Sequence, residues 1–368
     1  MDALSVTSGV VTLSGIFAYI NHRFFRLPTT IGLMLITLVI SAAIIFMGKM
    51  GLHFDTLAEE MVRTIDFDET LMHGMLSFLL FAGALHININ DLGDQKYVIS
   101  FLATFGVLIS TVIVGSISYW LLCLIGSEIP FIYCLLFGSL ISPTDPISVL
   151  SILKTAGAPK SLETKISGES LFNDGVGVVV FLIISGVAAG GHEIIITDAL
   201  GLFFKEAVGG AVFGLGAGYI TFLMLRGVDN YQVEVLLTLG LVMGGYSLAS
   251  ALHLSAPIAI VVAGLLIGNH GRMLGMSEKT REHLDNFWEL LDEILNAVLF
   301  VLIGLEILII PFDTYPFWVA LTMIPVVLSA RFISVSIPVV LFRFRRSFSP
   351  NVIKILTWGG LRGGISVA

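Results

Sequence analysis

The chain has 368 residues, of which 56% are hydrophobic and only 12% are charged, and its mean hydropathy is +0.97. A soluble domain carries about 25% charged residues, so this composition excludes an ordinary soluble protein and indicates a polytopic membrane protein in a lipid bilayer. The formal charge of −8 is spread over short loops, and no nucleic-acid patch, Gly-rich phosphate cradle or Cys/His metal spacing appears.

Apolar runs between charged or Gly/Pro-containing breaks predict about twelve helices. In chain order they cover residues 4–22, 29–48, 70–88, 97–125, 131–153, 165–188, 199–225, 231–251, 256–268, 284–309, 316–342 and 352 to the end. The stretch 51–69 carries six acids and is expected to form an external connection. The last apolar segment is too short to finish a crossing, so a further helix is expected beyond it.

The basic residues predict the orientation of the helices. Lysines and arginines gather in alternate loops, whereas the opposite loops hold only Lys49 and Arg63. Because cytoplasmic loops carry the excess of basic residues, we expect the N-terminus outside and the 343–354 loop in the cytoplasm. The cell (inner) membrane is the predicted location.

The fifth predicted helix contains a break near its middle. Pro143 and Pro146 each remove a backbone donor and clash with the preceding turn, so the helix should open around Thr144 and Asp145. Unpaired backbone groups and a carboxylate are costly in hydrocarbon and survive there only beside a cavity or an ion. The freed carbonyls and Asp145 therefore predict an oxygen site for a small cation, although a surface loop between two half-helices is the alternative.

The sixth helix places more polar side chains at the same depth. Ser170 and Asp174 are four residues apart and share one face, with Glu169 and Asn173 one position round. Asp174 lies about 13 Å from Lys165 along the helix, close to the middle of the bilayer. An acid at that depth indicates a functional site, whereas a polar cluster that only sets helix register is the alternative.

Glu169 needs a positive partner if it is buried beside Asp174. Arg331 and Arg362 are the two arginines within predicted helices, and we expect Glu169 to form a structural ion pair with one or both. The glycines around Arg362 predict a second interrupted helix. Matching interruptions in two halves of a transporter indicate an inverted repeat with a binding site at the midplane.

The motifs SPTDPISV, GESLFNDG and GGLRGG, with a mid-helix arginine, resemble those of the monovalent cation:proton antiporters, in particular the electroneutral NhaP-type branch related to the sodium/hydrogen exchangers. The resemblance implies an all-α inverted-repeat fold of thirteen helices with two crossing discontinuous helices, the last helix being absent from this chain. It also implies a homodimer. Residues 1–90 and 191–310 would form the dimerisation part, and residues 91–190 and 311–368 the ion-transport core.

The resemblance also implies roles for individual residues. The ion ligands would be Thr144 through its backbone carbonyl, Asp145, Ser170 and Asp174, and Asn173 would mark the electroneutral branch. Some relatives carry an acid in the third helix, where this chain has Ala82, His86 and Asn88. Sodium (or lithium or potassium) and the proton would be the transported partners, with no cofactor and no enzymatic activity.

Two other functions fit parts of the pattern. A sodium-coupled symporter can use the same broken helices but needs a roomier polar pocket. An intramembrane aspartyl protease also needs two acids on neighbouring helices, but one in a Gly-x-Gly-Asp turn, and here the sequences are PTDP and FNDG.

Overall fold

The computed structural model describes residues 3–50, 74–146, 149–150, 152–153, 157–189, 196–271, 278–309, 317–344, 348–360, 362 and 366. All regular structure within these residues is helical. The helices, including three π-helical turns, follow in chain order: α1 (Ala3–Ile20), η1 (Asn21–Phe25), α2 (Thr29–Lys49), α5 (Leu76–Leu85), α6 (Ile89–Phe101), η3 (Leu102–Gly106), α7 (Val107–Leu124), α8 (Phe131–Ile141), α10 (Lys160–Ala188), α11 (Ile196–Arg226), α12 (Tyr231–Ala251), α13 (Ala256–Leu266), η4 (Ile267–Gly271), α15 (Glu278–Glu306), α16 (Phe317–Phe342) and α17 (Val352–Trp358).

Each predicted helix overlaps a helix of the structure, but several begin earlier than predicted, the sixth at Lys160 and the tenth at Glu278. The fourth was expected to begin at residue 97, but α6, η3 and α7 form one helical run from Ile89 to Leu124. The early part is polar because it lies at an exposed end, where a helix need not be apolar. It begins with a side-chain cap, since the Asn88 side chain accepts a hydrogen bond from the Asn90 N–H (2.8 Å).

Six helical runs among the described residues are long and apolar enough to cross a membrane: Thr29–Gly48, Ile89–Leu124, Lys160–Ala188, Gly201–Arg226, Tyr231–Ala251 and Trp318–Phe342. Three apolar helical segments are shorter: Leu76–Leu85, Phe131–Ile141 and Ala256–Gly271. Phe131–Ile141 is short because the predicted break ends it.

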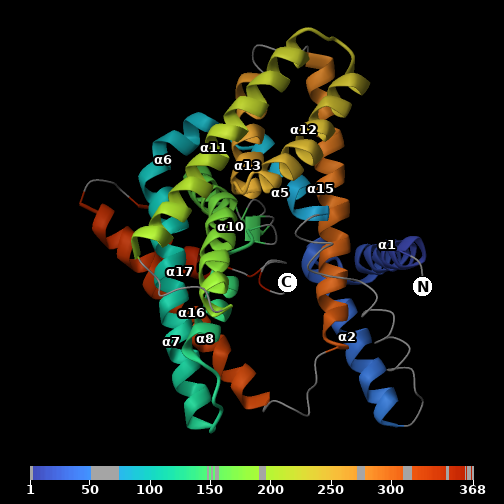
Figure 1. Cartoon of the computed structure of the whole chain (residues 1–368). Coiled ribbons are helices and arrows are strands. Elements are labelled where there is room, and N and C mark those ends of the chain that lie inside the picture. The colour runs from blue at the N-terminus through green and yellow to red at the C-terminus, as the bar shows by residue number, and fades with distance from the viewer. Residues whose placement is uncertain are drawn as a thin grey trace.

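The helices pack around several hydrophobic clusters. The largest joins α5, α11, α12, α13 and α15, with Trp288 fully buried in it. A second joins α1, α2 and α15, and a third joins α6, α10, α16 and α17 with Val149 and Leu153. Figure 1 shows α7, α8 and α16 together at the lower left, while α15 runs alongside α2 on the right.

Glycines let α7 and α8 approach closely. A methyl group added at Gly138 would lie 2.5 Å from the backbone oxygen of Thr111, and one at Gly115 would lie 3.0 Å from the oxygen of Cys134. Small residues at a helix interface allow such close backbone packing in membranes. This contact anchors α8, whose end leads directly into the polar centre of the molecule.

Candidate functional site

The backbone opens immediately after α8. The helix ends at Ile141, and residues 142–146 are not helical, where Pro143 and Pro146 supply no N–H groups. The Ser142 hydroxyl donates a hydrogen bond to the carbonyl of Gly138 (2.6 Å) and accepts one from the Thr111 hydroxyl (3.3 Å). The predicted break is therefore present, and side chains satisfy part of the opened helix end.

Two side chains of α10 hold the unwound stretch at Thr144. The Ser170 hydroxyl donates to the Thr144 carbonyl oxygen (2.6 Å), and Asn173 Nδ2 donates to Thr144 Oγ1 (2.9 Å). All three residues are at least 96% buried. The break and the polar face of α10, separated by 26 or more positions, thus form one hydrogen-bonded unit.

A glycine makes this approach possible. A methyl group added at Gly177 would lie 3.3 Å from Cδ of Pro143 and closer still to Cγ of the same ring. No side chain other than hydrogen leaves room for the proline at this point. Gly177 therefore positions the unwound stretch against α10, one turn beyond Asn173.

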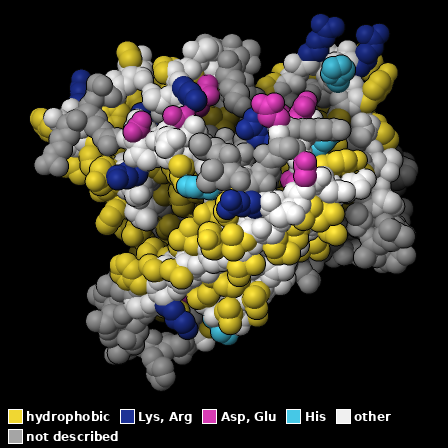
Figure 2. Space-filling model, turned by 90° about the horizontal axis from the view of Figure 1, so that it is seen from above, with side chains coloured by type: hydrophobic (Ala, Val, Ile, Leu, Met, Phe, Trp, Pro, Cys, Tyr) yellow, Lys and Arg dark blue, Asp and Glu magenta, His cyan; other side chains and the backbone are white. Residues whose placement is uncertain are grey.

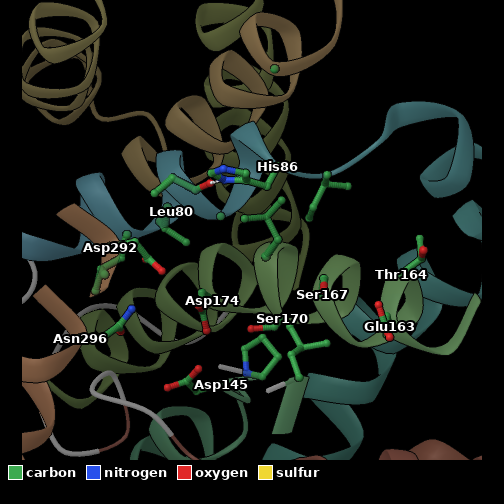
Figure 3. A pocket seen from close by; sticks show the side chains of 18 of the residues that line it. Leu80, His86, Asp145, Glu163, Thr164, Ser167, Ser170, Asp174, Asp292 and Asn296 are labelled. Atoms are coloured by element: carbon green, nitrogen blue, oxygen red, sulfur yellow. Dashed lines mark hydrogen bonds between the residues drawn. The ribbon is translucent and has the colours of Figure 1, made fainter. Parts of the chain in front are cut away.

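A cavity of about 900 Å³ opens beside this unit, and its walls include Thr144, Asp145, Ser170 and Asp174. Figure 3 shows Asp145 and Asp174 facing the same space, Asp174 from α10 and Asp145 from the unwound stretch. The two carboxylates are close enough to repel each other electrostatically. The structure thus brings together all four residues for which an ion-binding role was predicted.

The site-shaping residues divide into two groups. Pro143 and Pro146 line the cavity with the four ligand residues. Asn173 lies behind them, 1% exposed, and its side-chain oxygen has no hydrogen-bond partner among the residues described. Asn173 therefore supports Thr144 without lining the cavity itself.

Glu169 is paired on the far side of α10. Both terminal nitrogens of Arg331 donate to its carboxylate, Nη2 to Oε2 at 2.9 Å and Nη1 to Oε1. Arg331 Nε also donates to the Leu356 carbonyl (3.3 Å), and the absence of a side chain at Gly360 leaves room for the guanidinium group. Of the two arginines that the sequence offers, the structure places Arg331 on Glu169.

Arg362, the second candidate arginine, has other contacts than Arg331. Its Nη1 donates to the Gly360 carbonyl (3.2 Å), whereas Nε and Nη2 are buried without a partner in the described part of the chain. It forms no ion pair with Glu169 there. Most of the glycine-rich segment around it lies outside the described residues, so the predicted second break is seen only at its start, where α17 ends at Trp358.

One wall of the cavity was not predicted from the sequence. Glu289, Asp292 and Asn296 of α15 line it, and Figure 3 shows Asp292 and Asn296 directed toward Asp145 and Asp174. The signal was present, because positions 289, 292 and 296 lie on one face of a predicted apolar helix. Ala82, His86 and Asn88 of the third predicted helix also line the cavity.

The cavity reaches the surface at a charged end of the molecule. Lys160 lines it and pairs there with Asp91 (Nζ–Oδ2 3.1 Å), and the Lys160 side chain is 78% exposed. Figure 2 looks onto the end of the molecule at which α11 ends and α15 begins, and acidic and basic side chains gather on this face. A charged entrance and an acidic interior suit a cation more than an anion.

The oxygen atoms of the site indicate which class of ligand it can bind. Carboxylate, hydroxyl and carbonyl oxygens are ligands of hard cations. No group of three His, Cys, Asp or Glu side chains close enough to hold a metal ion occurs among the described residues. The oxygen atoms of the site therefore suit a small, hard cation.

Comparisons with known proteins agree with this chemistry. Residues 10–368 match the family model described as sodium/hydrogen exchanger, transmembrane. The chain is 52% identical to the Na(+)/H(+) antiporter NhaP of Pseudomonas aeruginosa, over 99% of this chain and 87% of that protein. It is 35% identical to the Na(+)/H(+) antiporter NhaH of Halobacillus aidingensis, over 94% of this chain and 83% of that protein.

A solved structure matches the fold. The sodium proton antiporter MjNhaP1 of Methanocaldococcus jannaschii, solved at pH 8, superposes with a TM-score of 0.76 over 100% of this chain and 85% of that chain. The sequence identity is 19%, so this similarity bears on the fold alone.

Proposed function

Because the chain belongs to the sodium/hydrogen exchanger family, we propose that it exchanges sodium ions for protons across the membrane. The observation that carries the proposal is the placement of Asp145 and Asp174 around one cavity, beside a backbone opened at Thr144. Relatives that are 52% and 35% identical to this chain, over 99% and 94% of its length, are named Na(+)/H(+) antiporters.

The exchange rests on competition for one carboxylate. Asp174 forms no ion pair with a described basic residue, and it faces the second carboxylate of Asp145. Two facing carboxylates in a poorly solvated site need a positive charge between them. A carboxylate that holds a proton is no longer available to hold sodium, so the two cations occupy the site in turn.

The surrounding residues position this exchange. Ser170 and Asn173 hold Thr144, which lines the same cavity as Asp174, and the Thr144 carbonyl oxygen can accept a second contact besides the Ser170 hydroxyl. The ion pair of Glu169 with Arg331 removes a third negative charge from the site. Sodium would thus be held by Asp145, Asp174, Ser170 and the Thr144 carbonyl.

The proposal includes a one-for-one exchange. Asp174 would bind either one sodium ion or one proton, so equal charge would move in each direction and membrane voltage would have no effect. The uncharged side chain of Asn173 and the pairing of Glu169 with Arg331 support this stoichiometry. Alternating access would result from motion of a core containing α7, α8, α10, α16 and α17 against a scaffold containing α1, α2, α12, α13 and α15. Two hydrophobic clusters support that division, one joining α1, α2 and α15 and the other joining α6, α10, α16 and α17. A thirteen-helix inverted repeat, a homodimer and an N-terminus outside the cell membrane belong to the same proposal.

Reconstituted liposomes test the proposal. A sodium gradient imposed on liposomes that contain the purified chain and a pH-sensitive dye should move protons, and Asp174→Asn should abolish this movement. Glu293→Gln is the matched control, because Glu293 is exposed and lies outside the described lining of the cavity. Clamping the voltage with valinomycin and potassium should leave the rate unchanged. Wild-type liposomes that move no protons would reject the function, and a voltage-dependent rate would reject the stoichiometry.

A further inference from the structure

Helix α15 forms one wall of the cavity over much of its length. Arg281, Glu289, Asp292 and Asn296 all line it, over a distance of about 22 Å at 1.5 Å per residue. The spacing places Glu289, Asp292 and Asn296 on one face of the helix, and their depth increases from the charged entrance toward Asp145 and Asp174. The wall therefore runs from the charged entrance to the part of the cavity that holds Asp145 and Asp174.

The buried side-chain oxygen of Asn296 makes no hydrogen bond with another described residue. The residue is 2% exposed, and Oδ1 has no hydrogen-bond partner in the part of the chain that the structure describes. Asp292 stands one turn earlier on the same face of α15, and Figure 3 shows both side chains directed into the cavity. A buried carbonyl oxygen without a donor is unfavourable unless a ligand in the cavity approaches it.

Asp292 adds a negative charge to the same place. It interacts electrostatically with Asp145 across the cavity, and Figure 3 shows both side chains directed into it. No described lysine or arginine forms an ion pair with Asp292. Among the described residues, Lys160 is paired with Asp91 and Arg331 is paired with Glu169. Carboxylates that share a cavity in this way are stabilised by a cation or by a proton.

We propose that Asp292 and Asn296 of α15, together with Asp145, form a second cation position that sodium occupies before it reaches Asp174. The inference rests on the exchange of sodium proposed above. Sodium loses part of its water to the carboxylate of Asp292 and the carbonyl of Asn296, and Asp145 faces both positions. The cavity of about 900 Å³ leaves room for the ion to keep some of its water there.

Sodium binding to an exchange-inactive variant tests the position directly. Radioactive sodium is titrated onto the detergent-purified full chain at alkaline pH, in a scintillation proximity measurement. Asp174→Asn should abolish exchange and yet retain weak sodium binding, and Asp174→Asn/Asp292→Asn should lower that binding by about tenfold or more. Asp174→Asn/Glu293→Gln is the matched control and should bind as Asp174→Asn does.

Exchange kinetics supply a second measurement. In liposomes, Asp292→Asn should raise the sodium concentration for half-maximal exchange by about tenfold, and Asn296→Ala should raise it by less. Asp292→Glu should return this concentration to the wild-type value. Glu293→Gln should leave it unchanged, and elution as a single peak in gel filtration checks that each variant is folded. If Asp292→Asn leaves both residual binding and half-saturation as they were, the second position does not exist. If wild-type liposomes exchange sodium normally in that case, the proposed function stands.

Discussion

The guanidinium group of Arg331 in α16 binds the carboxylate of Glu169 in α10 through both terminal nitrogens, across 162 positions of the sequence. Both residues are buried, at 6% and 1% exposure. The pair joins the helix that carries Asp174 to a distant helix of the chain. It also keeps Glu169 from adding its charge to the exchange site.

Removing one partner of this pair should destabilise the protein strongly. Arg331→Ala leaves a buried carboxylate without a positive partner, which costs about 3–5 kcal/mol. Arg331→Lys should also be destabilised, because an ammonium group cannot make the same two-point contact. Thermal unfolding in detergent, followed by tryptophan fluorescence, measures the loss. The double variant Glu169→Gln/Arg331→Gln should unfold at a higher temperature than Arg331→Ala, and equal melting would show that the charge is not the cause.

The hydrogen bonds to Thr144 should tune sodium affinity. Ser170→Ala and Asn173→Ala each remove one bond to the unwound stretch, worth about 1–1.5 kcal/mol, so half-saturation should rise by about tenfold. Exchange in liposomes over a range of sodium concentrations measures the shift. Ser139→Ala is the control, because the Ser139 hydroxyl donates within α8, to the Leu136 carbonyl, and bonds to no other helix among the described residues. An equal shift in Ser139→Ala would point to general destabilisation.

The close contact between α7 and α8 should not tolerate a methyl group. Gly138→Ala would force a carbon atom against the Thr111 carbonyl and should lower the free energy of unfolding by about 1–3 kcal/mol. Gly240→Ala in α12 meets nothing within 4 Å and should be neutral, or more stable by about 1 kcal/mol. Thermal melting of the two variants gives the comparison, and a stable Gly138→Ala would mean that the helices are less tightly packed than described.

The two ends of the molecule should react with labels from opposite sides of the membrane. In Figure 1, α7 ends at the bottom, and α11 passes into α12 at the top. In a chain with both natural cysteines replaced by serine, Glu128→Cys should react in whole cells with a maleimide that cannot cross the membrane. Gly227→Cys should react only after the cells are opened. The reverse result would invert the orientation predicted from the basic loops.

Much of this protein could be predicted from local sequence. Apolar runs located the helices because a bilayer requires long stretches without charge, and Pro143 and Pro146 located the break because proline removes the backbone donor wherever it stands. The polar face of α10 was equally readable, since residues four apart share a face in any α-helix.

The partners of these residues were decided by tertiary structure alone. Nothing local distinguishes Arg331 from Arg362 as the partner of Glu169, and only the packing of α16 against α10 does so. The same holds for Asp292 and Asn296, whose role depends on which helix borders the cavity. Local geometry determines where a chain can fold into a helix and where it must break. Which side chains meet depends on contacts between segments that are far apart in the sequence, and no local pattern encodes them.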